Sequence, residues 1–167
     1  MALGLRSFSS EDWSPLEDQG LISLGYQLQP NDAAVSLDLG LSYSEDDRRI
    51  VIASAEQAKL RAGVWEASAG VHKEFGGPRW SVHPYCGVGL ALLVINRRLA
   101  DASDTELTVE DNASMAGYAR AGLLWRIYPG AQVGLDLRFT SAGDVRFGDM
   151  RIDGDHFHVG VVFRGSM

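Results

Sequence analysis

Long apolar runs are missing from this sequence of 167 residues. The longest apolar stretch, residues 86–95, contains glycine and is well short of the ~18 residues that a membrane-spanning helix requires. The chain is therefore expected either to stay in water or to cross a membrane as β-strands, whose hydrophobic signal per strand is much weaker.

Other scarcities exclude further classes of protein. The single Cys86 excludes an intramolecular disulfide. A formal net charge of −7 argues against nucleic acid as a partner, because phosphate binding needs a basic surface. Lys59 and Lys73 are the only lysines. Lysine commonly protects water-exposed sheet edges from pairing with another chain, so its scarcity is unusual for a sheet that faces water. The start, MALGLRSF, lacks a secretory pattern, so if the protein is exported, this sequence is expected to be its mature portion with a start methionine added.

What the sequence does contain is alternation of apolar and polar residues, which is clearest over residues 21–43. Every second residue is apolar in 21–28, and residues 35–43 repeat the pattern. Successive side chains of a strand point to opposite faces, so each segment predicts a strand with one apolar face. Residues 29–32, Gln-Pro-Asn-Asp, are typical of a turn. A hairpin is not stable alone, so the rest of the chain must add strands.

The same pattern predicts eight strands in all. Besides the hairpin, they cover residues 3–9, 60–75, 80–95, 114–128, 132–141 and 155–163. Long connections (10–20, 45–57, 96–112, 142–154) alternate with short turns (29–32, 76–79, 128–131). An even number of strands with short turns at one rim is the pattern of an outer-membrane β-barrel. Both termini are then expected at the short-turn rim, and a barrel of this size is filled by side chains.

The polar face of these strands predicts which side is inside. Its charges balance, with Arg6, Arg120, Arg126 and Arg138 against Asp38, Glu66, Glu74 and Asp136. Glycines between them leave room for long side chains, which must pair when buried. We expect this face inside, with Arg138 paired to a carboxylate such as Asp136 or Asp38, and the apolar face against lipid. A soluble lipocalin-like barrel with the apolar face inside is the alternative.

Aromatic residues of the apolar faces cluster toward the strand ends, as the aromatic belts of membrane proteins do. They are Tyr26, Tyr43, Trp65, Phe75, Trp80, Trp125, Phe139, Phe157 and Phe163.

The histidines raise the question of a metal site. A turn centred on residues 76–79 pairs His72 with His83 across the hairpin, and Glu74 could then complete three ligands. Hydrogen bonding in the interior is the simpler role for this pair, and also for His156 and His158, which are expected to point inward near the long-loop rim. A pH-sensitive interior is a further possibility for these groups.

Motifs for catalysis or cofactor binding are missing. The sequence has no GxSxG nucleophile motif. Gly87-Val88-Gly89 does not precede a helix, and Asp153-Gly154-Asp155 lacks the spacing of a calcium loop. We therefore expect no enzymatic activity, no cofactor and no metal. The acidic loops are expected to be solvated, and divalent cations bridging them to lipopolysaccharide are a further hypothesis.

Four stretches resemble those of a known family: residues 3–13 (LGLRSFSSEDW), 83–91 (HPYCGVGLA), 134–139 (GLDLRF) and 157–163 (FHVGVVF). Through them the whole chain resembles the small eight-stranded outer-membrane β-barrels of Gram-negative bacteria, the OmpA/OmpX-like superfamily. Such motifs specify a fold and no activity. Members usually end on an aromatic residue that the assembly machinery reads, whereas Phe163 is followed here by Arg-Gly-Ser-Met.

The sequence thus predicts an all-β protein, one domain over residues 1–167, folded as an eight-stranded antiparallel up-and-down transmembrane β-barrel with a filled polar interior. The resemblance implies a monomer in the bacterial outer membrane, with the short turns in the periplasm. Its implied partners are the lipid bilayer, lipopolysaccharide and the barrel-assembly machinery. The expected function is non-enzymatic, in envelope structure or in surface interaction through the long loops. A small-solute channel and a soluble ligand-binding barrel are the alternatives.

Overall fold

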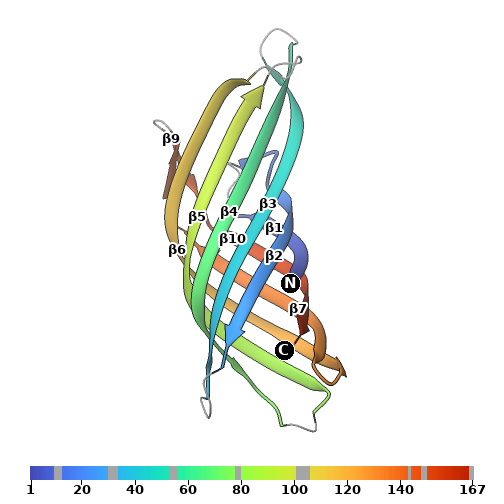
Figure 1. The fold of residues 1–167 in the computed structure, drawn as a ribbon. Coiled ribbons are helices and arrows are strands. Elements are labelled where there is room, and N and C mark those ends of the chain that lie inside the picture. Colours follow the sequence, from blue (N-terminus) through green and yellow to red (C-terminus); the bar gives the residue numbers. More distant parts are fainter. Residues whose placement is uncertain are drawn as a thin grey trace.

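Eight strands close into a single antiparallel barrel in the computed structural model, which describes residues 1–9, 13–29, 34–52, 56–77, 80–100, 106–142, 144–147 and 150–165 (Figure 1). The strands of the described residues are β1 Ala2–Phe8, β2 Asp18–Leu28, β3 Ser36–Ile52, β4 Glu56–Glu74, β5 Val82–Ala100, β6 Glu106–Tyr128, β7 Ala131–Ser141, β8 Asp144–Phe147, β9 Met150–Asp153 and β10 His156–Gly165, and all except β8 and β9 belong to the barrel. The order around the barrel is β1-β10-β7-β6-β5-β4-β3-β2, and β8 and β9 form a separate hairpin. The predicted up-and-down barrel is confirmed.

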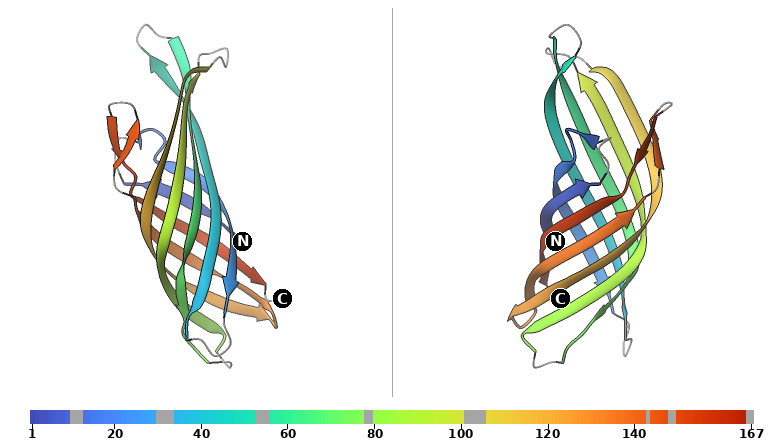
Figure 2. Two further views of the ribbon diagram at one scale, coloured as in Figure 1. Left: turned by 60° about the vertical axis from the view of Figure 1, so that its left-hand side comes forward. Right: turned by 180° about the vertical axis from the view of Figure 1, so that it is seen from behind.

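The strands β3 to β6 are much longer than the others and project beyond them at the upper end of Figures 1 and 2. They contain 17 to 23 residues, whereas β1, β2, β7 and β10 contain 7 to 11. A strand needs only about 9–11 residues to cross a bilayer. The upper parts of β3 to β6 therefore form an extension that stands clear of the part a membrane can cover.

Two of the predicted long loops are wrong, because much of each segment is β-strand. β3 continues to Ile52 and β4 begins at Glu56, inside the predicted loop 45–57. β5 continues to Ala100 and β6 begins at Glu106, inside the predicted loop 96–112. Residues 142–154 were expected as a polar loop and contain the β8–β9 hairpin. The connections between the long strands are accordingly short, and the barrel is longer at its upper end because the β-sheet itself continues there.

The apolar faces point outward, as predicted. Leu24, Val88 and Leu90 expose 58 to 60% of their surface, and Leu37, Leu137 and Val159 on other strands expose 44 to 49%. Opposite them, Arg6 and Glu66 expose only 1% and 2%. Soluble proteins rarely expose a contiguous apolar belt of this size. The arrangement is that of a barrel in lipid, and it is the reverse of a lipocalin-like barrel.

In the described part of the chain, no helix is long and apolar enough to cross a membrane.

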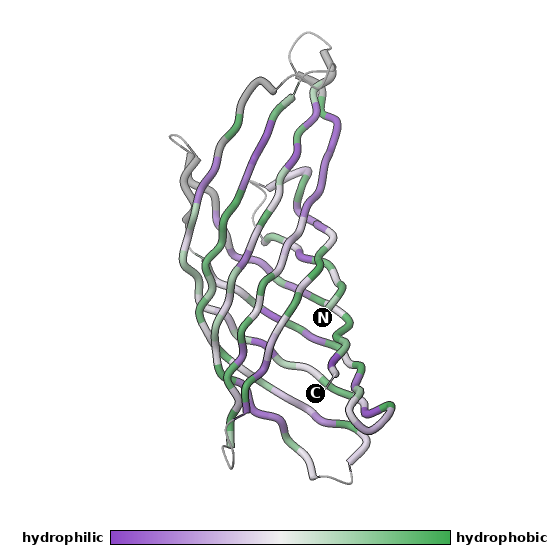
Figure 3. The backbone as a smooth tube through the Cα atoms, in the orientation of Figure 1, coloured by the Kyte–Doolittle hydropathy of each residue, from purple (hydrophilic) through white to green (hydrophobic). Residues whose placement is uncertain are grey.

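The apolar and polar faces exchange sides in the extension, above the level of Tyr43 and Trp65. Hydrophilic and hydrophobic residues alternate along the strands, and hydrophilic stretches are prominent at the upper end of the tube (Figure 3). Below that level β4 turns Ala67, Ala69 and Val71 outward; above it, the outward residues are Arg61 and Lys59. The inward residues become apolar there and form a cluster. Its members are Phe8, Trp13, Leu16, Leu60, Ala62, Val64, Ala91, Leu93, Ile95, Ala116, Tyr118 and Ala142.

This apolar cluster closes the upper mouth of the barrel. Trp13, from the connection between β1 and β2, stacks on Phe8 with ring centroids 3.8 Å apart and donates its indole N–H to the carbonyl oxygen of Asp153 at 2.8 Å. Leu16 of the same connection is 1% exposed. The predicted filled polar interior is therefore correct for the lower part of the barrel and wrong for its upper end, which is apolar.

The exchange of faces predicts opposite effects of a new charge at two outward positions. Leu90→Arg places a cation in the lipid-facing belt, and we expect it to lower the free energy of unfolding in lipid vesicles by about 2–4 kcal/mol. Val109→Arg places the same cation on the outer face of the extension, opposite Arg98, and we expect a loss of less than about 1 kcal/mol from that like-charge pair. Urea unfolding of vesicle-inserted protein measures both, and equal losses would contradict the assigned membrane boundary.

Candidate functional site

Glu66 is the centre of the uppermost polar layer inside the barrel. Arg6 donates from Nη2 to Glu66 Oε2 at 2.7 Å and to Ser42 Oγ at 3.1 Å, and from Nη1 to Ser44 Oγ at 2.9 Å. Arg138 forms a second ion pair with Glu66, and its guanidinium lies 3.7 Å from the centre of the Tyr118 ring. A buried carboxylate thus lies between two guanidinium groups from β1 and β7.

A second layer below it is centred on Asp136. Arg120 donates to Asp136 Oδ1 from Nε at 3.1 Å and from Nη2 at 3.0 Å, and it also pairs with Asp38. The hydroxyl of Tyr85 donates to the same Asp136 oxygen, and the Arg120 guanidinium lies over the Tyr85 ring at 5.3 Å. Charges from β3, β6 and β7 therefore pair across the barrel axis, and the second anion of this layer offsets the second cation of the Glu66 layer.

A third layer, at the lower end, joins Glu74 to Arg164 and His72. Arg164 forms an ion pair with Glu74, and His72 Nε2 lies 3.3 Å from Glu74 Oε1. The amide nitrogen of Gln27 lies 2.7 Å from the same His72 nitrogen. These contacts give Glu74 and the Nε2 atom of His72 their partners near the short turns, whereas the buried Nδ1 atom of His72 has no hydrogen-bond partner among the described residues.

The expected pairing of His72 with His83 is wrong. His72 lies opposite Gly87, because the connection between β4 and β5 is longer than the four-residue turn that was predicted. His83 lies near the carbonyl oxygen of Trp80 and near Arg126 instead. Among the described residues, no three His, Cys, Asp or Glu side chains converge as metal ligands. His156 and His158 are buried inside the barrel, as predicted.

The expected partner of Arg138 is also wrong. Asp136 and Asp38 were the candidates, but both pair with Arg120, and the carboxylate that pairs with Arg138 is Glu66 of β4. Arg138 and Glu66 lie on strands that are not neighbours. Their contact crosses the interior, and no pattern along a single strand indicates it.

The Glu66 layer predicts a coupled loss of stability. Glu66→Leu leaves two buried guanidinium groups, those of Arg6 and Arg138, without their shared anion, and we expect the free energy of unfolding to fall by about 3–5 kcal/mol. The double variant Glu66→Leu/Arg138→Leu should regain part of that loss, because one unpaired cation is removed with it. Urea unfolding in vesicles measures the wild type, both single variants (Glu66→Leu and Arg138→Leu) and the double variant, and losses of the two single variants that simply add in the double variant would contradict the layer.

The outer face of the extension carries a shallow hollow, which the sequence did not reveal. Its volume is about 260 Å³. Its lining residues are Tyr43, Glu45, Arg61, Gly63, Trp65, Asn96 and Arg98. The rings of Tyr43 and Trp65 are 4.6 Å apart, and a methyl group at Gly63 would lie 3.4 Å from the Tyr43 hydroxyl oxygen. The missing side chain at Gly63 leaves this space open beside the two rings.

Cross-strand register orders the surroundings of the hollow into rows. The lowest row aligns Tyr43, Trp65 and Val94 on β3, β4 and β5. The next aligns Glu45, Gly63, Asn96 and Asp111 on β3 to β6, and the third aligns Asp47, Arg61, Arg98 and Val109. A fourth row aligns Arg49, Lys59, Ala100 and Glu106 on β3 to β6. Aromatic residues thus form the lower edge of the hollow, and cations stand above it.

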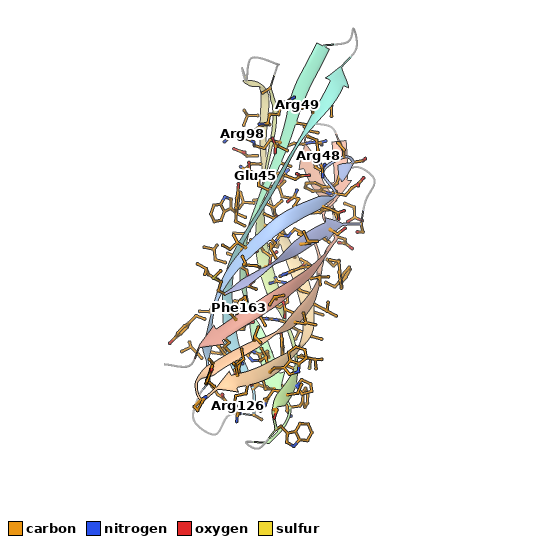
Figure 4. All side chains as sticks on the ribbon, turned by 90° about the vertical axis from the view of Figure 1, so that its right-hand side faces the viewer. Glu45, Arg48, Arg49, Arg98, Arg126 and Phe163 are labelled. Atoms are coloured by element: carbon orange, nitrogen blue, oxygen red, sulfur yellow. The ribbon has the colours of Figure 1, made fainter. Side chains whose placement is uncertain are left out.

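Ion pairs hold several of these side chains in place. Arg61 Nε lies 3.2 Å from Glu45 Oε1, and the Tyr43 hydroxyl donates to Glu45 Oε2 at 2.6 Å. Lys59 Nζ lies 2.9 Å from Asp47 Oδ2, and this hydrogen bond lowers the pKa of the Asp47 carboxyl group. Figure 4 places Glu45, Arg49 and Arg98 together at the upper end of the barrel, far from Arg126 at the lower end.

The acidic loops of the prediction are only partly within the described residues. Glu11, Asp12, Asp101 and Asp104 lie outside them. Glu45, Asp46 and Asp47, which were placed in a loop, belong to β3 and pair with Arg61, Arg48 and Lys59. The outer face of the extension therefore mixes both signs, with four described cations (Arg49, Lys59, Arg61, Arg98) and three described anions (Glu45, Asp47, Asp111).

Comparisons with known proteins identify the architecture. No protein-family model matches the chain, and no curated protein does. Among solved structures, Neisserial surface protein A (NspA) superposes with a TM-score of 0.62 at 14% identity, over 99% of this chain and 92% of that one. Ail, the attachment invasion locus protein of Yersinia pestis, superposes with a TM-score of 0.51 at 13% identity, over 98% and 92%. At such identities the likeness shows the fold alone, and the chain has the fold of the small eight-stranded outer-membrane β-barrels.

Proposed function

We propose that this chain is a non-enzymatic, monomeric protein of the bacterial outer membrane that uses its extension for interactions at the cell surface. The observation that carries the proposal is the exchange of faces above Tyr43 and Trp65. A protein that only had to span the bilayer would need no strands of 17 to 23 residues. The extra length forms a sheet with its own apolar core and a charged outer face, which is suited to binding.

The two solved structures support this assignment as neighbours of the same fold. NspA is a surface protein by name, and Ail is an attachment protein that was solved with the heparin analogue sucrose octasulfate. An anionic ligand on a barrel of this fold is compatible with the cations on the outer face of the present extension. The barrel-assembly machinery is the expected partner during insertion, and the domain is expected to include residues 1–167.

Passage of small solutes is the weaker candidate. The apolar cluster fills the upper mouth, and ion pairs cross the interior at the levels of Glu66, Asp136 and Glu74. An ion would have to break charge-assisted hydrogen bonds, which are among the strong ones in proteins. The interior thus stabilises the fold, and binding is left to the outer surface.

Chemical labelling tests the location and orientation. In a Cys86→Ser background, expressed with an export signal, we expect an impermeant maleimide to label Val109→Cys on intact cells. Tyr128→Cys, which is 70% exposed at the lower end, should react only after the outer membrane is permeabilised. Leu90→Cys in the lipid-facing belt is the control and should stay unlabelled in both. Labelling of all three in intact cells, or a folded monomer in buffer without detergent, would contradict the proposal.

Planar-bilayer recording tests the closed interior. We expect the purified wild-type barrel to insert without giving a steady single-channel current, because both the apolar cluster and the ion pairs block the axis. A general porin recorded in the same bilayers serves as the positive control. Stable, reproducible open states of this protein would favour a function as a small-solute channel over a role in surface interactions.

A further inference from the structure

Two pairs of cations lie directly opposite each other on the outer face of the extension. Arg61 of β4 is the cross-strand partner of Arg98 of β5, and Arg49 of β3 is the partner of Lys59 of β4. Like charges directly opposite on one face of a sheet destabilise it. The whole chain carries a net charge of −7, yet both pairs lie on this one face, where the described side chains are four cations and three anions and Glu106 of β6 aligns with Ala100 in the row of Lys59. Such grouping indicates a surface that receives an anion.

The hollow lies immediately below the Arg61–Arg98 pair and above the aromatic edge of the apolar belt. Trp65 is 46% exposed, and its ring contacts that of Tyr43, at the height where the outward residues change from apolar to charged. Tryptophan and tyrosine prefer the interface between hydrocarbon and water. The hollow therefore stands at the level of lipid headgroups, with guanidinium groups on its water side.

Neither guanidinium is without a partner in the structure. Arg61 contacts Glu45 at 3.2 Å, and Arg98 also has an interaction. The side chains of Arg61 and Glu45 are 46% and 38% exposed, so their pair is a surface ion pair of the kind that contributes little and exchanges readily. An entering phosphate can therefore take the place of the Glu45 carboxylate. Arginine suits this exchange, because its planar fork matches phosphate oxygens in two parallel hydrogen bonds.

We propose that this hollow binds a phosphate group of a lipid in the outer leaflet, the diphosphoryl glucosamine lipid that anchors lipopolysaccharide. Arg61 and Arg98 donate to the phosphate, and Tyr43 and Trp65 pack against the apolar part of the same molecule below it. Glu45 competes with the ligand for Arg61. The inference rests on the proposed function, since it needs the upper end of the barrel in the outer leaflet.

Titration of the purified barrel in a neutral detergent with diphosphoryl lipid A tests the site. Native mass spectrometry counts the bound lipid, and tryptophan fluorescence gives the affinity. We expect Arg61→Gln/Arg98→Gln to weaken binding by about tenfold or more. Glu45→Gln should strengthen it severalfold, because it removes the competing carboxylate. Loss of affinity in Glu45→Gln, or no change in the double arginine variant, would overturn the proposal.

A matched control lies on the same strand. Lys73 is an exposed outward cation of β4 at the opposite end of the barrel, where it lies over the Phe75 ring at 5.6 Å. Lys73→Gln removes one charge at the other interface, and we expect it to bind lipid A as the wild type does. Equal weakening by Lys73→Gln would mean that general charge attracts the lipid, which would overturn the proposal of a site at the hollow.

Two further titrations distinguish binding of the lipid from binding of other anions. Inorganic phosphate and sucrose octasulfate, each added without lipid, should bind the wild type much more weakly than lipid A does, because neither brings an apolar part to Tyr43 and Trp65. If either anion bound as tightly as lipid A or more tightly, the proposal of a lipid ligand would be overturned in favour of a soluble anion. Heat-dependent migration on denaturing gels shows that each variant is folded. A wild type that fails to fold in detergent would refute the proposed function, whereas folded variants with unchanged binding refute only this inference.

Discussion

Charges can lie inside this barrel only because each is held by an opposite charge. Glu66, at 2% exposure, lies between Arg6 and Arg138, and Asp136, at 3%, is held by Arg120 and Tyr85. Unpaired, any of these groups would cost several kcal/mol of stability. The pairing ties β1, β3, β4, β6 and β7 together across the axis. It also allows the opposite faces of the same strands to be largely apolar where they meet lipid.

The narrow interior explains why small residues accompany these charges. A methyl group at Gly70 would lie 2.3 Å from the Tyr118 hydroxyl oxygen, and one at Gly122 would lie 2.5 Å from that of Tyr85. Both tyrosines are among the buried partners of the arginines. Glycine at these positions therefore provides the space in which the aromatic rings lie beneath the guanidinium groups.

The exchange of faces above Tyr43 and Trp65 divides the protein into a membrane-spanning part and a water-exposed extension. Below that level, lipid solvates the outer side chains and the interior is polar. Above it, water surrounds the sheet, so the usual rule of apolar side chains inside returns and the cluster around Leu93 and Ile95 forms. The same continuous strands are thus surrounded by lipid in their lower part and by water in their upper part. The hollow with Arg61 and Arg98 lies at the boundary between lipid and water. The proposed binding of a lipid phosphate follows from that position.

Strand number, direction and facing were predictable from the sequence, because the alternation of side chains along a strand is a local property. Residues 21–43, with their turn, already contain this information, and the inward direction of His156 and His158 follows from it too. The upper strands were missed because the expected loops 45–57 and 96–112 are rich in charge, and their charged residues face water as those of a loop would. The turn before β5 was placed too tightly, which shifted the predicted partner of His72 from Gly87 to His83.

Tertiary structure alone decided which charges meet. Arg6 and Glu66 are 60 residues apart, and their contact depends on the closure of β1 against β10 and on the stagger around the whole ring. The apolar cluster likewise combines Trp13 and Leu16 of one connection with residues of β4 and β5. The hollow exists because register places Gly63 beside Asn96 and Arg61 beside Arg98. The sequence by itself determined the faces of each strand, since these repeat every two residues, whereas contacts across the barrel depend on register and closure, which no single strand encodes.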